Sequence, residues 1–341
     1  QTVALPISNV AETSLTVPGI KYVIDPGLAR ISRYSLRSKV QQLPIEAISQ
    51  ASANQRMGRC GRLSDGVCFR LYSEDEFNDR AQFTEPEILR TNLAAVILQM
   101  LQLKLGDIAR FPFLEKPNQK QVNDGFALLH ELGAVDANRA ITRLGRQLAR
   151  FPTDLRFARM LVAAGQMGCL HELLIITSAL AVQDPRERPF DHQQAADKAH
   201  KIYWHEKSDF LSLTTLWEDY ERKRQDLGQS QLRKMCRQNF LSYSRMREWR
   251  EMHRQLLLIC REQGMRINRN PADYSAVHRA LLTGLLGQVA RKSGEHEYQG
   301  ARNRKQFIFP GSSQFSRSPR WILSAELVET SRLFARSVAE I

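Results

Sequence analysis

The run QRMGRCGR at residues 55–62 constrains this chain more than any other segment, because it combines two glycines with closely spaced arginines. If the run is helical, Gln55, Arg59 and Arg62 lie at positions i, i+4 and i+7 on one face. The two glycines have no side chain, so this surface can approach another group closely. Guanidinium groups pair with phosphate oxygens in a bidentate geometry and keep their charge. The run therefore indicates a polyphosphate-binding surface, and the alternative interpretation is a solvated basic helix start.

The segments around this run give it a context. Upstream stand SNVAETSLTVPGI at 8–20 and YVIDPG at 22–27, which place small hydroxyl and amide residues before an apolar strand. In this order and spacing, these segments and the run resemble motifs V and VI of superfamily 2 helicases, and the DEAH/RHA branch in particular. RLYSEDEF at 70–77 and PEILRTNLA at 86–94 continue the match. The nearest resemblance is to bacterial HrpA-type ATP-dependent RNA helicases, and it covers essentially the whole chain.

The resemblance implies a multi-domain fold that joins an α/β part, an α part and a β part. We expect four domains: the end of a second RecA-like lobe at 1–78, a winged helix at 79–152, a helical ratchet bundle at 153–270 and an OB-fold barrel at 271–341. Leu333–Ile341 has the pattern of an unfinished strand, so we expect the OB-fold to be cut short. The sequence contains no G-x-x-x-x-G-K-[ST] phosphate loop and no D-E-x-H run. We therefore expect this chain to be the C-terminal part of a longer enzyme whose first lobe binds most of the ATP and Mg²⁺.

Local patterns add detail to each expected domain. Residues 31–48 predict a β-hairpin with a basic tip. Thr84-Glu85-Pro86-Glu87 has a capping-box pattern ahead of one amphipathic helix. A helix over 119–132 should end at Gly133, before a short two-stranded wing. Within 153–268, a stripe at Phe210, Leu213, Trp217 and Tyr220 favours a helical core over a base-stacking platform. Leu281–Ala290, Tyr298–Phe309 and Trp321–Thr330 predict strands.

Composition limits the classes of function. The net charge of +13 indicates a polyanionic partner, although this signal does not distinguish RNA from DNA, ribosomes or acidic lipid. No apolar run approaches the ~20 residues of a membrane span. The five scattered cysteines contain no C-x-x-C and predict a reducing compartment, here the bacterial cytoplasm. His130 and His171 each precede a glutamate, but neither completes a zinc motif, so we expect no metal site.

The resemblance also implies roles for individual residues. Arg59 and Arg62 would act as arginine fingers on ATP, and Gln55 would position the phosphate or water. Thr16 would contribute to nucleotide binding. Position 18 is Pro where many eukaryotic members have an Asp that contacts the nucleotide ribose, so the nucleotide preference does not follow from the sequence. Ser14 would couple the two lobes. The residues expected to contact RNA are Ser8, Asn9, Thr13, Arg33, Arg37, Lys39, Arg302, Arg304 and Lys305.

These roles define an enzyme that couples ATP hydrolysis to 3′-to-5′ movement on single-stranded RNA and remodels RNA or ribonucleoprotein. The isolated chain should be inactive, because it lacks a phosphate loop. Two alternatives belong to other classes. One is a non-enzymatic RNA-binding scaffold, and the other is a DNA-directed helicase, since phosphate contacts do not identify the sugar. Protein partners and the natural RNA do not follow from the sequence.

Overall fold

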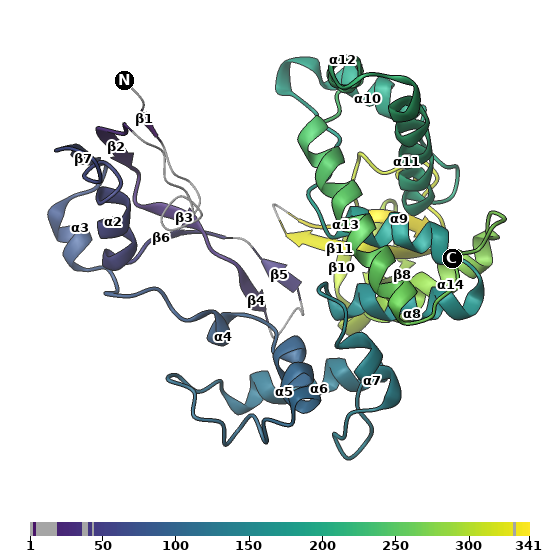
Figure 1. The fold of residues 1–341 in the computed structure, drawn as a ribbon, viewed down its shortest axis with the longest axis horizontal. Coiled ribbons are helices and arrows are strands. Elements are labelled where there is room, and N and C mark those ends of the chain that lie inside the picture. Colours follow the sequence, from purple (N-terminus) through teal and green to yellow (C-terminus); the bar gives the residue numbers. More distant parts are fainter. Residues whose placement is uncertain (1–2, 5–18, 36–39, 43, 330–331) are drawn as a thin grey trace. The chain divides into compact units, whose positions relative to one another are not determined.

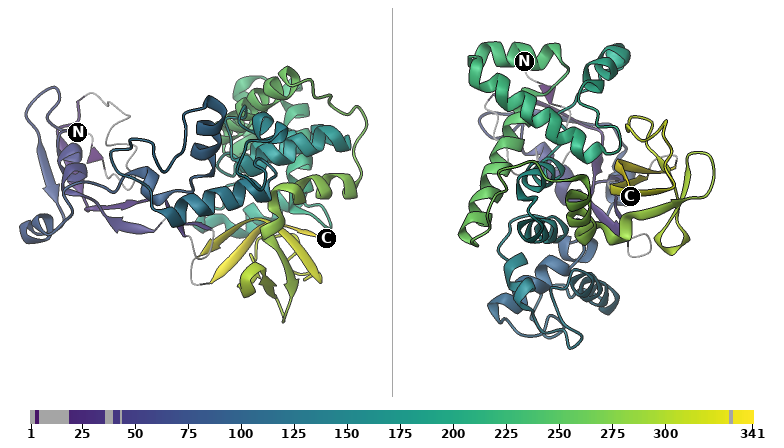
Figure 2. Two further views of the ribbon diagram at one scale, coloured as in Figure 1. Left: turned by 90° about the horizontal axis from the view of Figure 1, so that it is seen from below. Right: turned by 90° about the vertical axis from the view of Figure 1, so that its right-hand side faces the viewer.

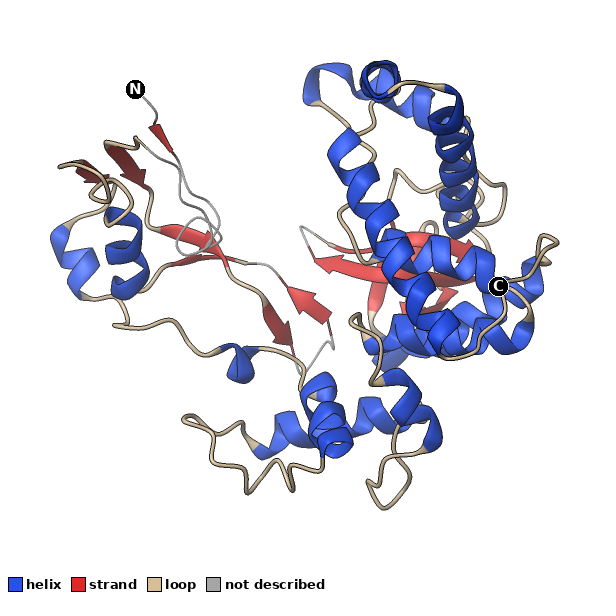
Figure 3. Ribbon diagram, viewed as in Figure 1, coloured by secondary structure: helices blue, strands red, loops and turns tan. Residues whose placement is uncertain are grey.

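The computed structural model describes residues 3–4, 19–35, 40–42, 44–329 and 332–341. Its contacts divide the chain into two units. The first comprises Gln1–Leu93 and Ile108–Asp124, and the second comprises Ala94–Asp107 and Gly125–Ile341. Figure 1 follows the elements along the sequence, and Figure 3 separates the helices from the strands. The two units are described separately.

The first unit contains a parallel sheet with the strand order β1-β2-β7. The central strand β2 (Tyr22–Asp25) pairs with β1 (Val3–Ala4) and with β7 (Val67–Arg70). Helix α2 (Gln50–Met57) packs against β2. Parallel strands with a helix on one face form an α/β arrangement, and a small core of Ala29, Ile31, Ile48 and Ala53 lies beside it.

Two antiparallel ladders extend from this sheet along one hairpin. β3 (Leu28–Arg30) pairs with β6 (Ile45–Ala47), and β4 (Arg33–Ser35) pairs with β5 (Val40–Gln42). The hairpin predicted over 31–48 is therefore confirmed. Its tip, which carries Arg37 and Lys39, lies outside the described residues.

The single capped helix predicted after Thr84 is wrong. Two helices stand there instead, α4 (Glu87–Arg90) and α5 (Ala94–Leu103). Pro86 occupies the N-cap of α4 without a side-chain hydrogen bond. The Thr84 hydroxyl shares hydrogen bonds with the hydroxyls of Ser49 (3.0 Å) and Ser52 (3.4 Å), so it joins the start of α2 rather than capping the helix that follows it.

Three helices come first in the second unit. They are α5, the part of α6 (Gln119–Glu131) from Gly125 onward, and α7 (Arg143–Leu148). Gly133 has φ +72° directly after α6, which is the backbone conformation expected of a C-terminal glycine. An antiparallel bridge between Val135 and Ile141 forms the predicted wing. Gly145 packs so closely that a Cβ there would lie 2.1 Å from the Ala134 carbonyl oxygen. The helix–helix–wing order is thus confirmed.

A helical bundle follows, with its helices visible from two further directions in Figure 2. Its members are α8 (Leu155–Met167), α9 (Leu170–Leu180), α10 (Gln193–Lys201), α11 (Asp209–Asp226), α12 (Gln229–Gln238) and α13 (Tyr243–Glu262). The stripe of α11 is buried as predicted, and the Trp249 indole donates to the Ile175 carbonyl at 3.1 Å. Among the described helices, none is long and apolar enough to cross a membrane.

The strand predicted over Leu281–Ala290 is wrong for most of its length. Helix α14 (Tyr274–Leu285) and a 3₁₀ turn (Leu286–Gln288) occupy that segment, and β8 (Val289–Lys292) begins only at Val289. The buried residues Val277, Leu281 and Leu285 recur every four positions, which is helical spacing. A short apolar run bounded by glycine does not by itself distinguish a buried strand from a buried helix.

The chain closes with a five-stranded barrel of order β10-β12-β11-β8-β9. The remaining strands are β9 (Glu297–Gly300), β10 (Lys305–Ile308), β11 (Trp321–Glu329) and β12 (Leu333–Glu340). A 3₁₀ turn (Ala301–Asn303) interrupts the predicted strand over Tyr298–Phe309. β12 pairs with both β10 and β11 and thereby closes the barrel.

Candidate nucleic-acid interface

Helix α2 holds the arginine-rich run in place through a buried ion pair. Arg56 and Asp25 are both at most 1% exposed, and a guanidinium nitrogen of Arg56 lies 2.8 Å from Oδ1 of Asp25. The same nitrogen donates to the Leu28 carbonyl at 3.1 Å. Asp25 also accepts from the Gly27 amide and the Tyr72 hydroxyl. The end of α2 is therefore fixed to the end of β2, and the sequence interpretation did not identify Arg56 as its anchor.

The run QRMGRCGR is not one continuous helix, which corrects the premise that placed three residues on one face. Helix α2 ends at Met57, and a turn follows from Gly58. The buried Cys60 donates its thiol to the Met57 carbonyl, and a Cβ at Gly66 would lie 2.3 Å from the Cys60 carbonyl oxygen. The chain thus folds back tightly after the helix, toward β7.

This turn presents polar side chains close together in the sequence. Gln55 is exposed at the end of α2, Arg59 is half-buried in the turn, and Arg62 is exposed beyond it. The sequence placed them on one helical face, whereas in the structure Gln55 belongs to the helix and Arg59 and Arg62 follow it. Two guanidinium groups beside an amide can bind phosphate oxygens.

Several predicted site residues lie outside the described residues. They are Ser8, Asn9, Thr13, Ser14, Thr16, Arg37 and Lys39. Among the described candidates in the first unit, Arg33 forms ion pairs with Glu46 (2.7 Å) and Glu85 (2.6 Å). The hydrogen bond that Arg33 donates to Glu46, followed by the one that it donates to Glu85, raises the pKa of Arg33 above its ordinary value. Its charge is already compensated within the protein, which weakens its case as a phosphate contact.

The barrel carries a surface that is better suited to contacting a nucleic acid than Arg33 is. We term this surface the barrel strip. It consists of Lys305, Phe307 and Phe309 on and just after β10, and of Arg332, Phe334 and Arg336 on and just before β12. The Arg332 guanidinium lies 4.9 Å from the Phe307 ring centroid, and Arg336 lies 4.7 Å from that of Phe309. The rings are half-buried while all three cations are exposed. Aromatic faces between cations suit the bases and phosphates of a single strand.

The predicted barrel residues differ in how they contribute. Lys305 belongs to the strip, although it also pairs with Glu297 at 2.6 Å. Arg302 is exposed in the 3₁₀ turn with φ +60°, and Arg304 donates to the Ala301 carbonyl at 3.1 Å. The sequence interpretation missed Arg332 and Arg336. The alternation of Arg332, Phe334 and Arg336, with its period of two, was the signal that could have found them.

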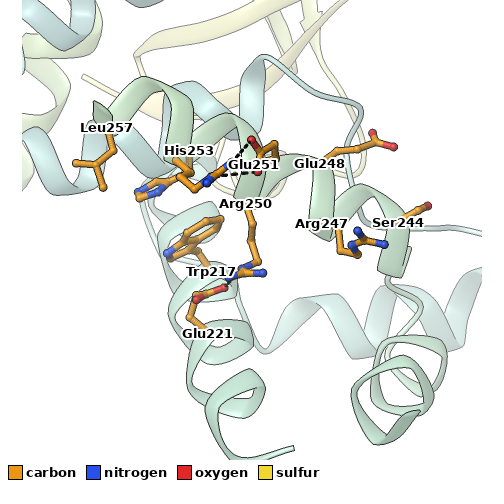
Figure 4. A pocket seen from close by; sticks show the side chains of 10 residues that line it. Trp217, Glu221, Ser244, Arg247, Glu248, Arg250, Glu251, His253 and Leu257 are labelled. Atoms are coloured by element: carbon orange, nitrogen blue, oxygen red, sulfur yellow. Dashed lines mark hydrogen bonds and ion pairs between the residues drawn. The ribbon is translucent and has the colours of Figure 1, made fainter. Parts of the chain in front are cut away.

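A hollow of about 710 Å³ lies between α11 and α13. Figure 4 shows the rings of Trp217 and His253 beside each other there, and their centroids are 4.6 Å apart. Burial lowers the pKa of His253 to about 4, so the imidazole is neutral at pH 7. Arginine and glutamate side chains line the hollow in equal number, and two pairs are in contact: Arg250 with Glu221 (2.6 Å) and Arg254 with Glu251 (2.8 Å). This balance of charge does not favour an anion.

Comparison with known protein families locates three domains between residues 127 and 341. The helicase-associated winged-helix model matches residues 127–153, the ratchet-like helicase-associated model matches 154–244, and the OB-fold model for oligonucleotide or oligosaccharide binding matches 277–341. The closed five-stranded barrel agrees with the OB-fold match.

Three curated proteins are similar over almost the entire chain. The ATP-dependent RNA helicase HrpA of Escherichia coli is 55% identical over 98% of this chain, and its homolog from Haemophilus influenzae is 54% identical over 98%. The probable ATP-dependent RNA helicase DHX35 of Homo sapiens is 33% identical over 98%. The chain spans only 26% of each bacterial relative and 47% of the human one.

Proposed function

Because this chain belongs to the family of HrpA-type ATP-dependent RNA helicases and spans part of such a protein, we propose that it works within an RNA-remodelling enzyme. That enzyme couples ATP hydrolysis to 3′-to-5′ movement along single-stranded RNA, and so unwinds RNA or remodels ribonucleoprotein. The observation that carries the proposal is the similarity to named RNA helicases over nearly the whole chain. The two bacterial relatives and the expected reducing compartment favour the bacterial cytoplasm as its location.

In the first unit, Arg59 and Arg62 act on the phosphates of ATP. The buried contact between Arg56 and Asp25 supports this role, because it fixes the end of the helix from which both arginines follow. Gln55 positions the phosphate or the attacking water, and Thr16 contributes to nucleotide binding. ATP supplies the phosphoryl group, and Mg²⁺ compensates part of the phosphate charge. We assign most of the binding of ATP and Mg²⁺ to residues outside this chain. Guanidinium groups stabilise the charge that develops in phosphoryl transfer.

RNA contacts come from both units. Ser8, Asn9 and Thr13 touch the RNA backbone, Ser14 couples nucleotide state to movement, and the hairpin tip adds Arg37 and Lys39. The barrel strip supports the RNA assignment independently, because its rings can stack on unpaired bases while its cations meet phosphates. Arg302 and Arg304 extend that surface.

The chain alone binds RNA without turning over ATP, as expected of a part that lacks a phosphate loop. The test is the steady-state ATPase rate of the full-length protein, with and without single-stranded RNA, beside the same assay on residues 1–341. We expect RNA-stimulated turnover by the full-length protein and none by the chain. Turnover stimulated equally by single-stranded DNA would favour the DNA-directed alternative. Absence of turnover in the full-length protein would favour a non-enzymatic RNA-binding scaffold.

A further inference from the structure

Helix α12 presents a second cationic surface, away from the barrel strip. Figures 1 and 2 place α12 at the end of the helical bundle that lies away from the barrel strands. Gln229, Ser230, Arg233, Lys234 and Arg237 line a hollow of about 480 Å³ on this helix. All five side chains are exposed, and we term them the α12 surface.

No acidic residue lies within α12 or in the segment that leads from it into α13. Residues 227–247 contain five cations (Arg233, Lys234, Arg237, Arg245 and Arg247) and no carboxylate. In the part of the chain that the structure describes, no ion pair engages Lys234 or Arg237. The hollow between α11 and α13 differs, because its arginines face an equal number of glutamates. An anion is therefore drawn to α12 rather than to that neighbouring hollow.

The bundle holds this helix in a fixed orientation. Leu232 and Cys236 are at most 4% exposed and anchor the opposite face of α12 in the core around Trp217 and Trp249. Arg233 and Arg237 are four residues apart, so they lie on one face about 6 Å apart along the helix axis. Both can contact one anionic backbone at once.

The chemistry of the surface selects a nucleic-acid backbone rather than a membrane. A helix that binds a lipid surface exposes an apolar face, whereas the apolar face of α12 is buried in the bundle. None of the five residues of the α12 surface is aromatic, so this surface itself offers no ring for base stacking. Cations together with glutamine and serine side chains suit phosphate and ribose oxygens.

We propose that the α12 surface is a second RNA-binding site, which binds the phosphate backbone without reading bases and therefore accepts paired RNA. This proposal rests on the proposed function, since it assumes that the protein binds RNA. It extends that function by separating two tasks. The barrel strip binds unpaired bases, while the α12 surface holds a duplex or structured region of the same RNA.

The test measures binding of a fluorescent blunt-ended RNA duplex, and of a single strand, to the full-length protein across a salt series. The variant R233Q/K234Q/R237Q removes three exposed charges from α12. The matched control R188Q/R222Q/R254Q removes three charges from exposed arginines of the same bundle that are paired with Asp197, Asp219 and Glu251. Thermal unfolding of both variants should match that of the wild type, because all six side chains are exposed.

We expect the α12 variant to weaken duplex binding and to reduce the slope of log affinity against log salt by about 2 to 3. The control should change the slope by less than about 1. Equal losses in the two variants, or no loss in the α12 variant while the wild type binds duplex RNA, would overturn the proposed site. Failure of the wild-type protein to bind any RNA would instead overturn the proposed function, and this inference with it.

Discussion

A guanidinium nitrogen of Arg56 donates to Oδ1 of Asp25 at 2.8 Å, and both side chains are buried, shortly before Arg59 and Arg62 in the chain. Removing one partner of a buried ion pair leaves an uncompensated charge and costs about 3–5 kcal/mol. We therefore expect Arg56→Met to lower the free energy of unfolding of the first unit by roughly that amount. Arg30→Met is the control, because Arg30 is exposed. Urea denaturation that gives equal midpoints for the two variants would contradict this account.

Asp209, at the start of α11, holds the barrel against the helical bundle. Its carboxylate accepts hydrogen bonds from the Ser312 hydroxyl (2.5 Å), from the Ser313 amide and hydroxyl (2.9 and 2.7 Å), and from the Val338 amide (2.8 Å). Hydrogen bonds to a charged group contribute about 1.5–3 kcal/mol each. Asp209→Ala leaves these donors without their acceptor, so we expect a loss of at least about 3 kcal/mol in unfolding experiments. Asp226→Ala, at the exposed end of the same helix, should leave stability almost unchanged.

Two glycines on neighbouring helices provide a matched pair for the packing of α8 against α14. A Cβ at Gly284 of α14 would lie 2.4 Å from the Arg156 carbonyl oxygen, whereas one at Gly165 of α8 would meet Met265 at an ordinary 3.5 Å. We expect Gly284→Ala to destabilise the second unit by about 1–3 kcal/mol through overpacking. Gly165→Ala should be neutral or stabilising, because alanine favours helix at this position. Calorimetric midpoints that rank the two variants in the opposite order would refute the close packing.

His278 makes stability depend on pH. Its Nδ1 lies 2.7 Å from the Tyr274 carbonyl oxygen and must donate, so Nε2 accepts from the Ser208 hydroxyl at 2.8 Å. Burial lowers the pKa of His278 to about 4, below its ordinary value of 6.5. The unfolded chain therefore binds the proton first as the pH falls. The contribution of the neutral imidazole to the free energy of unfolding is fully present above pH 6.5. It is lost progressively as the pH falls from 6.5 to about 4.

Two measurements check this expectation. The ring ¹⁵N shifts of His278 should keep the Nδ1–H tautomer until the pH approaches 4, and the free energy of unfolding should fall by about 3 kcal/mol over the same window. The control is H278F, which removes the titrating group; its stability profile should be flatter than that of the wild type in this window, whatever its absolute stability. An imidazole that titrates near 6.5 in the folded protein would contradict the buried network.

The sequence predicted elements whose signals are local. The hairpin over 31–48, the glycine that ends α6 and the buried stripe of α11 each depend on spacing within one segment. The arginine-rich run was expected to be one helix, but its helix ends at Met57, and its role at the ATP site stays a prediction.

The features that the sequence did not predict depend on distant partners. Arg56 and Asp25 are 31 positions apart, and Arg33 and Glu85 are 52 apart, so no periodicity connects either pair. An arginine that is buried against an aspartate looks the same in the sequence as one that faces solvent. The helical spacing of Val277, Leu281 and Leu285 was readable, but the apolar run was interpreted as a strand.

The most direct test of the central claim is the ATPase rate of full-length R59A and R62A at saturating single-stranded RNA, with R30A as the control. If these arginines stabilise the charge of phosphoryl transfer, each variant should lose on the order of 10³-fold in kcat. The affinities for ATP and RNA should change little, and the control should retain its activity. Wild-type turnover in both R59A and R62A would contradict the assignment of this turn to the ATP site.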